Sequence, residues 1–381
     1  MSPGEVLFVA EQLRSRVPGG IGTYVAGLVE ALPTIAPDPV PDVTLLASRA
    51  KSPDPISALG RPVRLLPLPS RLLVKAWDLG TVRLGRGFRV VHAPSVMTPP
   101  TTVPLVVAVH DLAWRRVPSA YPARGRRWHE AALGRALRRG GRFVVPSEAV
   151  AGELGEALGP GGAGRVELVE YGADHLPAPD HAAAVSRLRR LGVEGEFLLA
   201  VGTLEPRKNL ARLLAAYSLV RPSLPEPWPL VLVGPRGWGA GRAPGEGVAG
   251  PVPEGVCLAG AVPGAELSAL YGSCRCLAYV SLFEGFGLPV AEAMRAGAPV
   301  VASRVPAAGG AALEVDPLDV ESIAEGLLAA STDEGRRAQL VAAGRVRASR
   351  LTWSAAAAAH ARVWRQAAEE GDGRRRAAGR R

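Results

Sequence analysis

Two glutamates separated by seven residues, Glu284 and Glu292, flank a glycine-rich stretch in the segment SLFEGFGLPVAEAMRAG, residues 281 to 297. Pro289 suits the start of a helix, because its missing amide would be unpaired there, and Gly297 marks the end of that helix. The amides of a first helical turn lack backbone partners and lie at the positive end of the helix dipole. They therefore form a suitable site for a phosphate group.

The two acids need a partner other than that phosphate, because carboxylates and phosphates repel each other. Sugar hydroxyls are suitable partners, since an ionised carboxylate accepts O–H hydrogen bonds firmly. The segment therefore indicates a site for a nucleotide sugar, whereas a single glutamate would be explained as well by the helix dipole alone. The residues expected to line the phosphate are Gly285, Phe286, Gly287 and Leu288.

Further candidates follow other apolar runs of the chain. In GTLEPRKNL, Arg207 and Lys208 are suited to clamp a diphosphate, and Asn209 suits the N-cap of the next helix. A solvated loop is the alternative for these cations. In PGGIGTYV, Gly20 and Gly22 would let backbone amides approach a phosphate or sugar, although a structural turn explains them equally well.

His110 ends the apolar run VVAVHDLAW, and we expect it to face a cleft, with an ordinary core histidine as an equal alternative. Ser147 in VVPSEAV is expected to cap a helix. It is not surrounded by the Gly-x-Ser-x-Gly motif of a hydrolase nucleophile.

Short apolar runs alternate with helix-like segments and predict the elements that position these residues. One series extends through residue 147, and a second begins near residue 197. This rhythm is typical of βαβ units and predicts an α/β protein with two similar halves, in which ligands bind beyond the carboxyl ends of the strands. A stretch rich in Pro, Ala and Gly over residues 175 to 193 is predicted to be the linker.

Composition narrows the class of protein. The chain has 381 residues, is 48% hydrophobic and carries a formal net charge of +10. Its three cysteines are too few for a disulfide framework, no metal site is expected, and no apolar run reaches the roughly 18 residues of a membrane span. The positive charge would attract anionic ligands or surfaces, but no aromatic-interleaved basic motif supports nucleic-acid binding.

Taken together, these stretches resemble the retaining glycosyltransferases of the GT-B fold, in particular mannosyltransferase-like members of glycosyltransferase family 4. The resemblance implies two Rossmann-like domains that face each other across a cleft. It implies that Glu284 binds hydroxyls of the donor sugar and Glu292 the nucleotide ribose. The motifs that carry it are GGIGTYV, HDL, PSE, GTLEPRKNL, LVGPRGWG, ELSALY, SLFEGFGLPVAEAM and VDPLDVESIAEGL.

The same resemblance implies that Arg207 and Lys208 bind the diphosphate, that Gly20 and Gly22 close over it, and that His110 approaches the sugar. Transfer would proceed with retention through an oxocarbenium-like transition state, without a cofactor or metal. The expected donor is a nucleoside diphosphate sugar, with GDP-mannose as the first expectation. The expected acceptor is a glycan or lipid-linked molecule of cell-envelope or polysaccharide biosynthesis, and the expected location is the cytoplasm. A nucleotide-sugar epimerase of the same fold is the alternative enzyme.

Two features differ from the family pattern: Thr203 stands where many relatives have arginine, and the loop at 303 to 313 is short and lacks a Pro-Glu-Val. The expected organisation is an acceptor-side domain over 1 to 180, a donor domain over 194 to 350, a helix over 351 to 368 that crosses back to the first domain, and a disordered basic tail over 369 to 381.

The segment ARGRRWHEAALGRALRRGGR, residues 123 to 142, predicts an amphipathic helix. Trp128, Ala132 and Leu133 or Leu137 fall on one apolar side, and arginines supply a cationic surface that suits anionic lipid on the inner face of the cell membrane. A solvated helix that packs Trp128 and Leu137 into the first domain is the alternative.

Overall fold

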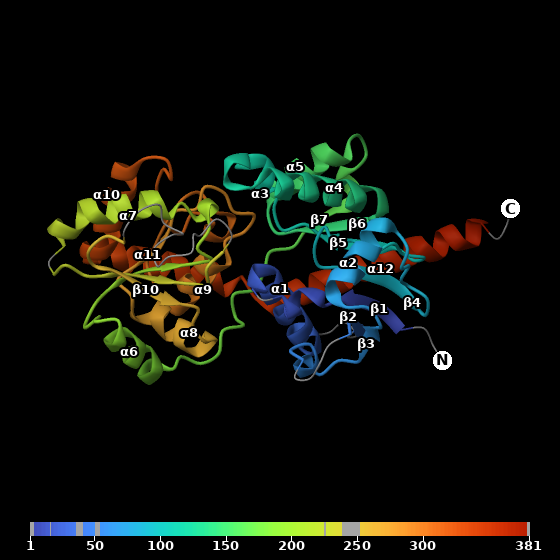
Figure 1. Cartoon of the computed structure of the whole chain (residues 1–381), viewed down its shortest axis with the longest axis horizontal. Helices are drawn as coiled ribbons and strands as arrows, with labels where there is room; N and C mark the ends of the chain where they lie inside the picture. The colour runs from blue at the N-terminus through green and yellow to red at the C-terminus, as the bar shows by residue number, and fades with distance from the viewer. Residues whose placement is uncertain are drawn as a thin grey trace. The chain divides into compact units, whose positions relative to one another are not determined.

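The computed structural model describes residues 4–15, 17–35, 41–49, 54–224, 226–237 and 252–378. The chain forms two compact units, each built on one parallel sheet (Figure 1). Unit 1 contains residues 1–115, 121–172 and 353–381, and unit 2 contains residues 116–120 and 173–352. The expected α/β class with two Rossmann-like halves is confirmed.

Unit 1 has a parallel sheet with the strand order β3-β2-β1-β4-β5-β6-β7 in its described residues. Helices cover such sheets on both faces, so the inner strands are buried and their sequences are continuous apolar runs. The strands are β1 (Gly4–Val9), β2 (Val43–Ser48), β3 (Val63–Leu66), β4 (Phe88–Ala93), β5 (Leu105–Ala108), β6 (Arg142–Val145) and β7 (Val166–Leu168).

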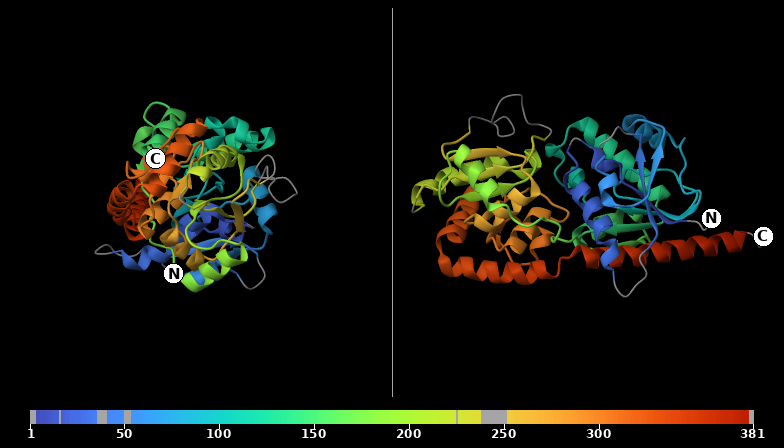
Figure 2. Two further views of the ribbon diagram at one scale, coloured as in Figure 1. Left: turned by 90° about the vertical axis from the view of Figure 1, so that its left-hand side faces the viewer. Right: turned by 90° about the horizontal axis from the view of Figure 1, so that it is seen from below.

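The helices of unit 1 come from both ends of the chain. The C-terminal helix α12 packs against α1, β4 and β5, and Figure 2 shows it running along one side of unit 1. The helices are α1 (Gly19–Ala31), α2 (Ser70–Leu79), α3 (Ala113–Arg116), α4 (Ala123–Arg139), α5 (Glu148–Leu158) and α12 (Trp353–Ala378). The predicted cap of α5 is confirmed, because the Ser147 hydroxyl accepts a hydrogen bond from the Val150 amide.

Unit 2 has a second parallel sheet, with the order β10-β9-β8-β11-β12-β13. Its strands are β8 (Leu198–Val201), β9 (Leu230–Val233), β10 (Val256–Gly260), β11 (Leu277–Tyr279), β12 (Val300–Ala302) and β13 (Leu313–Glu314). Its helices are α6 (His181–Arg190), α7 (Leu210–Val220), α8 (Gly264–Ser273), α9 (Leu288–Ala296), α10 (Val320–Thr332) and α11 (Glu334–Ser349).

Two predictions about irregular segments are wrong. The predicted linker over 175 to 193 contains α6, which packs against α8 and belongs to unit 2. The amino-terminal part of unit 1 therefore ends at Gly172 and not at residue 180. The tail that was predicted to be disordered over 369 to 381 is helical through Ala378, and residues 379 to 381 lie outside the described residues. Salt bridges hold it, because Glu370 pairs with Arg142 at 2.6 Å and Asp372 with Arg89 at 2.8 Å.

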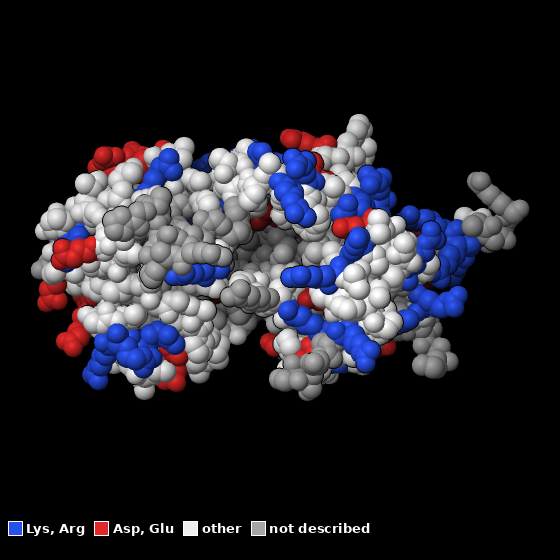
Figure 3. Space-filling view, viewed as in Figure 1, with Lys and Arg blue, Asp and Glu red and all other residues white. Residues whose placement is uncertain are grey.

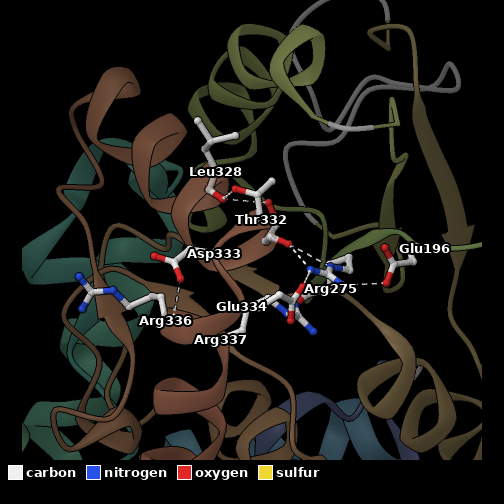
Figure 4. Close-up of polar contacts among 9 residues, drawn as sticks. Glu196, Arg275, Leu328, Thr332, Asp333, Glu334, Arg336 and Arg337 are labelled. Atoms are coloured by element: carbon white, nitrogen blue, oxygen red, sulfur yellow. Dashed lines mark hydrogen bonds and ion pairs between the residues drawn. The ribbon is translucent and has the colours of Figure 1, made fainter.

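An arginine cluster fastens the amino ends of two strands of unit 2 to its last helices (Figure 4). Arg275, just before β11, donates hydrogen bonds to Glu196 at 2.8 Å and to the carbonyl of Ser331 at 2.9 Å, and it pairs with Glu334. The Asp333 carboxylate caps α11 by accepting the Arg336 amide at 2.9 Å. This network lies at the opposite ends of the strands from the candidate site, so we assign it to stability.

A buried polar chain joins α1, β4 and α12 inside unit 1. The Trp364 indole can only donate, so the bond of 3.1 Å to His92 Nδ1 leaves the proton of His92 on Nε2. His92 Nε2 lies 3.0 Å from the Tyr24 hydroxyl, which in turn lies 2.7 Å from His360 Nε2. His360 Nδ1 donates to the carbonyl of Ala356 at 2.7 Å. Every donor thus meets one acceptor while both histidines are neutral.

This chain should make unit 1 sensitive to acid. Burial lowers the pKa of His360 to about 4, and burial also holds the pKa of His92 well below its usual value. Between pH 6.5 and 4, these histidines bind protons in the unfolded chain but stay neutral in the folded protein. The free energy of unfolding should therefore fall as the pH falls through this range. The expected slope is about 1.4 kcal/mol per pH unit for each histidine.

Urea unfolding of the whole protein at pH 7, 6 and 5 would measure this slope. The exposed His181 provides a matched control, because His181→Gln should keep the parental slope whereas His360→Gln should reduce it. Equal slopes in all three proteins would show that the buried chain does not govern acid sensitivity.

Candidate functional site

The segment with the two glutamates follows β11 and forms a glycine turn and the helix α9, Leu288–Ala296, close to the predicted bounds. Gly287 adopts a φ of 100° before the helix and Gly297 a φ of 84° after it, both in the region that favours glycine. The amide of Ala307 donates to the carbonyl of Phe286 at 2.8 Å. The short loop at 303 to 313 is therefore fixed against this turn.

Glu284 lies between two cations from the loop after β8. Its Oε1 atom is 2.8 Å from Nη1 of Arg207 and 2.7 Å from Nζ of Lys208. All three side chains are largely buried, and that of Glu284 is 9% exposed. The residues chosen for the sugar and for the diphosphate are thus in direct contact.

The electrostatics of this cluster favour an ionised Glu284. Burial alone would raise the pKa of its carboxyl, but the charges of Arg207 and Lys208 outweigh burial and lower the pKa to about 2. Burial lowers the pKa of Lys208, and the charge of Glu284 opposes that shift. Glu284 therefore remains a charged hydrogen-bond acceptor throughout the physiological pH range.

Two further residues of this cluster were missed by sequence reasoning. The Tyr279 hydroxyl, at the end of β11, accepts a hydrogen bond of 2.7 Å from Lys208 and also bonds Glu284. Glu205 is buried and contacts Nη2 of Arg207 at 2.8 Å. Glu205 could have been predicted, because it stands two residues before Arg207 in the motif GTLEPRKNL. Tyr279 could not, because its position in an apolar strand is the same as that of a core residue.

Asn209 corrects one prediction. It occupies the N-cap position of α7 with a φ of 59°, but its side chain does not cap the helix. Its amide donates instead to the carbonyls of Val280 at 3.1 Å and Pro317 at 2.6 Å. Asn209 therefore fastens the loop with Arg207 and Lys208 to the segments that follow β11 and β13.

Glu292, on α9, has a separate set of partners among the described residues. Its Oε2 accepts a hydrogen bond of 2.9 Å from the Tyr271 hydroxyl of α8, and its Oε1 lies 3.2 Å from Nε2 of His175. Glu292 is 7% exposed. Each of its oxygens retains a lone pair for a further donor.

His110 lies in unit 1, just after β5. Its Nε2 donates to the carbonyl of Pro94 at 2.5 Å, so its Nδ1 accepts the hydrogen bond of 2.5 Å from the Tyr171 hydroxyl. Burial lowers the pKa of His110. The ring is thus neutral, and both of its nitrogens already have hydrogen-bond partners. This arrangement suits a residue that shapes a site better than one that transfers a proton.

The glycines of PGGIGTYV also lie in unit 1, inside the first turn of α1 and not in a turn before it. At Gly22 a Cβ atom would lie 2.4 Å from the Cβ of Pro18, so close packing requires glycine there. Gly20 is exposed. A role for Gly20, Gly22 and His110 in one site with Glu284 stays a prediction.

No cluster of metal-ligating side chains occurs within the described residues. In the same part of the chain, no helix is sufficiently long and apolar to cross a lipid bilayer.

Models of two protein families match the two units. Residues 19–172 match the Glycosyl transferase 4-like domain, and residues 195–333 match the family Glycosyl transferases group 1. The second match includes every residue of the Glu284 cluster together with Glu292.

The chain is also similar to mannosyltransferases. It is 30% identical over 277 residues to the O-antigen chain mannosyltransferase B of Escherichia coli, across 69% of this chain and 71% of the relative. It is 32% identical over 225 residues to the phosphatidyl-myo-inositol mannosyltransferase of Mycobacterium tuberculosis, across 54% of this chain and 58% of that protein.

Solved structures resemble the fold over nearly the whole chain. Sucrose-phosphate synthase from Thermosynechococcus elongatus matches with a TM-score of 0.70 and 20% identity, over 95% of this chain and 98% of the other. Anabaena HepE in complex with UDP and glucose matches with a TM-score of 0.66 and 18% identity, over 96% and 99%. These likenesses show the GT-B fold.

Proposed function

We propose that this chain, which belongs to the GT4-type glycosyltransferases, transfers a hexose from a nucleoside diphosphate sugar to a glycan or lipid-linked acceptor with retention of configuration. The observation that carries the proposal is the contact of Glu284 with Arg207 and Lys208. An ionised acceptor beside two cations suits a ligand that presents sugar hydroxyls next to a diphosphate.

In this proposal the cations bind the leaving diphosphate. Arg207 has five N–H donors and Lys208 has three, so each can share its bonds between Glu284 and phosphate oxygens. The amides of Gly285, Gly287 and Leu288, in the turn that leads into α9, would add to this stabilisation. Negative charge that develops on the leaving group is then balanced by fixed groups of the protein, and we propose that no metal is required.

Glu284 would accept hydroxyls of the transferred sugar, and Glu292 would accept those of the ribose. Mannose from GDP-mannose is our first proposal for the donor, because two relatives that match more than half of this chain are mannosyltransferases. HepE was solved with UDP and glucose, so UDP-glucose is the first alternative to test.

A panel of GDP and UDP sugars, assayed with excess EDTA, would test the proposal. We expect one donor to raise the melting temperature and to yield a transferred product whose anomeric configuration matches the donor. Release of a free sugar epimer without transfer would identify an epimerase instead. Loss of activity with EDTA would contradict metal independence.

The exposed face of α4 supports a lipid-linked acceptor. Ala132 and Leu133 are buried, but Trp128 is 36% exposed, so the prediction that it shares their apolar side is wrong. Arg135 and Arg139 bond to neighbours inside unit 1. The other exposed residues of α4 are Ala123, Arg124, Arg127, Glu130, Ala131 and Arg138, and Glu130 is paired with Arg115.

We propose that this cationic face with one tryptophan binds anionic lipid peripherally, since arginines attract acidic headgroups and tryptophan favours the interface. Figure 3 shows Lys and Arg side chains over the part of unit 1 where Figure 1 labels α4 and α2. The protein should sediment with acidic phospholipid vesicles at low salt and be released at high salt.

Changing Arg124, Arg127 and Arg138 to Gln should weaken this sedimentation by about 100-fold, because each arginine contributes about 1 kcal/mol near such a surface. A matched variant loses the same charge elsewhere through Gln at the exposed Arg189, Arg190 and Arg350. If both triple variants bind vesicles equally, α4 is not the docking face.

A further inference from the structure

The segment 173 to 180, which overlaps the start of the predicted linker, is fixed on unit 2. The amide of Ala173 donates to the carbonyl of Leu351 at 3.0 Å, and the amide of Asp180 donates to the carbonyl of Ala265 at 3.0 Å. Between these ends, Pro177 packs so closely on Gly264 that a Cβ there would lie 3.1 Å from the proline ring. His175 therefore projects from a fixed backbone.

His175 and Tyr271 hold Glu292 from two sides. His175 Nε2 lies 3.2 Å from one carboxylate oxygen, and the Tyr271 hydroxyl donates to the other at 2.9 Å. The His175 side chain is 16% exposed and that of Glu292 is 8% exposed. Tyr271 is fully buried, and burial holds its pKa well above the usual value, so it remains a donor.

A glutamate side chain has several rotatable bonds, and fixing it on ligand binding would oppose affinity. Two donors already hold Glu292 in one orientation. Each carboxylate oxygen can accept a second bond, so this arrangement leaves Glu292 ready for two neighbouring hydroxyls.

We propose that His175 is a positioning residue that, together with Tyr271, orients the Glu292 carboxylate toward the ribose hydroxyls of a bound nucleoside diphosphate. The inference rests on the proposed function, because it takes a nucleotide sugar as the donor. It adds a residue from the connecting segment to the donor site and predicts which hydroxyls of the ligand depend on it.

Calorimetry with GDP and with 2′,3′-dideoxy-GDP tests this role, with the UDP pair as a second set of probes. His175→Ala should weaken GDP binding about tenfold, since Glu292 loses a charge-assisted partner. The same change should alter binding of the dideoxy ligand by no more than about twofold, because that ligand has no ribose hydroxyl that could donate a hydrogen bond to Glu292. Tyr271→Phe should show the same selectivity.

His175→Gln supplies a conservative variant, because its amide nitrogen can donate from nearly the position of the imidazole Nε2, and it should retain near-parental affinity for GDP. His181→Ala, at the exposed start of α6, is the matched control and should bind both ligands as the parent does. Equal losses for GDP and the dideoxy ligand would show that His175 has only a structural role, while the proposed function would stand. If the parent binds neither GDP nor UDP, the proposed function fails and this inference fails with it.

Discussion

Glu284→Gln should leave the protein folded and reduce transfer at saturating donor by about 100-fold or more. The amide keeps the shape of the side chain, but it replaces a charged acceptor by a neutral group. Lys208 then loses the carboxylate that it contacts, and Arg207 keeps only Glu205. The loss should appear mainly in kcat, because the hydrogen bonds to the sugar strengthen as charge develops in the transition state.

A control for this variant is Glu314→Gln, since Glu314 is exposed and pairs with the exposed Arg304 in unit 2. Circular dichroism and urea unfolding at pH 7 would establish that both variants are folded. Parental kcat in Glu284→Gln would remove Glu284 from the site.

Glu284 should also affect how the stability of the protein depends on pH. Its pKa of about 2 lies below the value of 4.5 expected in the unfolded chain, so its ionised form stabilises the folded protein above pH 4.5. That stability is lost as the pH falls toward 2. The glutamine variant should lack this part of the acid sensitivity.

The interior of both sheets could be predicted from sequence, because strands covered on two faces are continuous apolar runs. The strands β3, β7 and β13 have no such run, and each lies at the edge of its sheet. Their residues are only partly buried, so they lack both a continuous apolar run and a clear alternation.

The candidate site divides in the same way. Arg207, Lys208 and Glu284 were predictable because charges directly after apolar runs are uncommon without a ligand or partner. Tyr279 and His175 were not, since each is defined by a contact with a residue far along the chain. His175 also lies in a stretch rich in proline and alanine, whose composition says little about a backbone held by tertiary contacts.

Replacing both Arg207 and Lys208 by alanine should have the largest effect on binding. We expect the dissociation constant for the nucleoside diphosphate to rise by about 30-fold to 1,000-fold. This range corresponds to roughly 2 to 4 kcal/mol for two charged hydrogen bonds to a partly buried phosphate. Binding of the nucleoside without phosphates should change much less, because these side chains face the diphosphate in the proposed complex.

The double variant also leaves Glu284 as a buried carboxylate without its cations, so part of any loss could come from instability and not from the missing contacts. A triple variant that adds Glu284→Gln removes this unpaired charge and should recover part of the stability without recovering nucleotide affinity. The rest stays lost because the buried Glu205 still lacks Arg207. Lys75 and Arg304 are both exposed, and their replacement by alanine removes the same net charge outside the cluster. Calorimetry would compare the nucleotide affinity of the parent, the Lys75 and Arg304 control, and the Arg207 and Lys208 variant. If all three affinities are equal, Arg207 and Lys208 do not bind the diphosphate, and their contact with Glu284 only stabilises the fold.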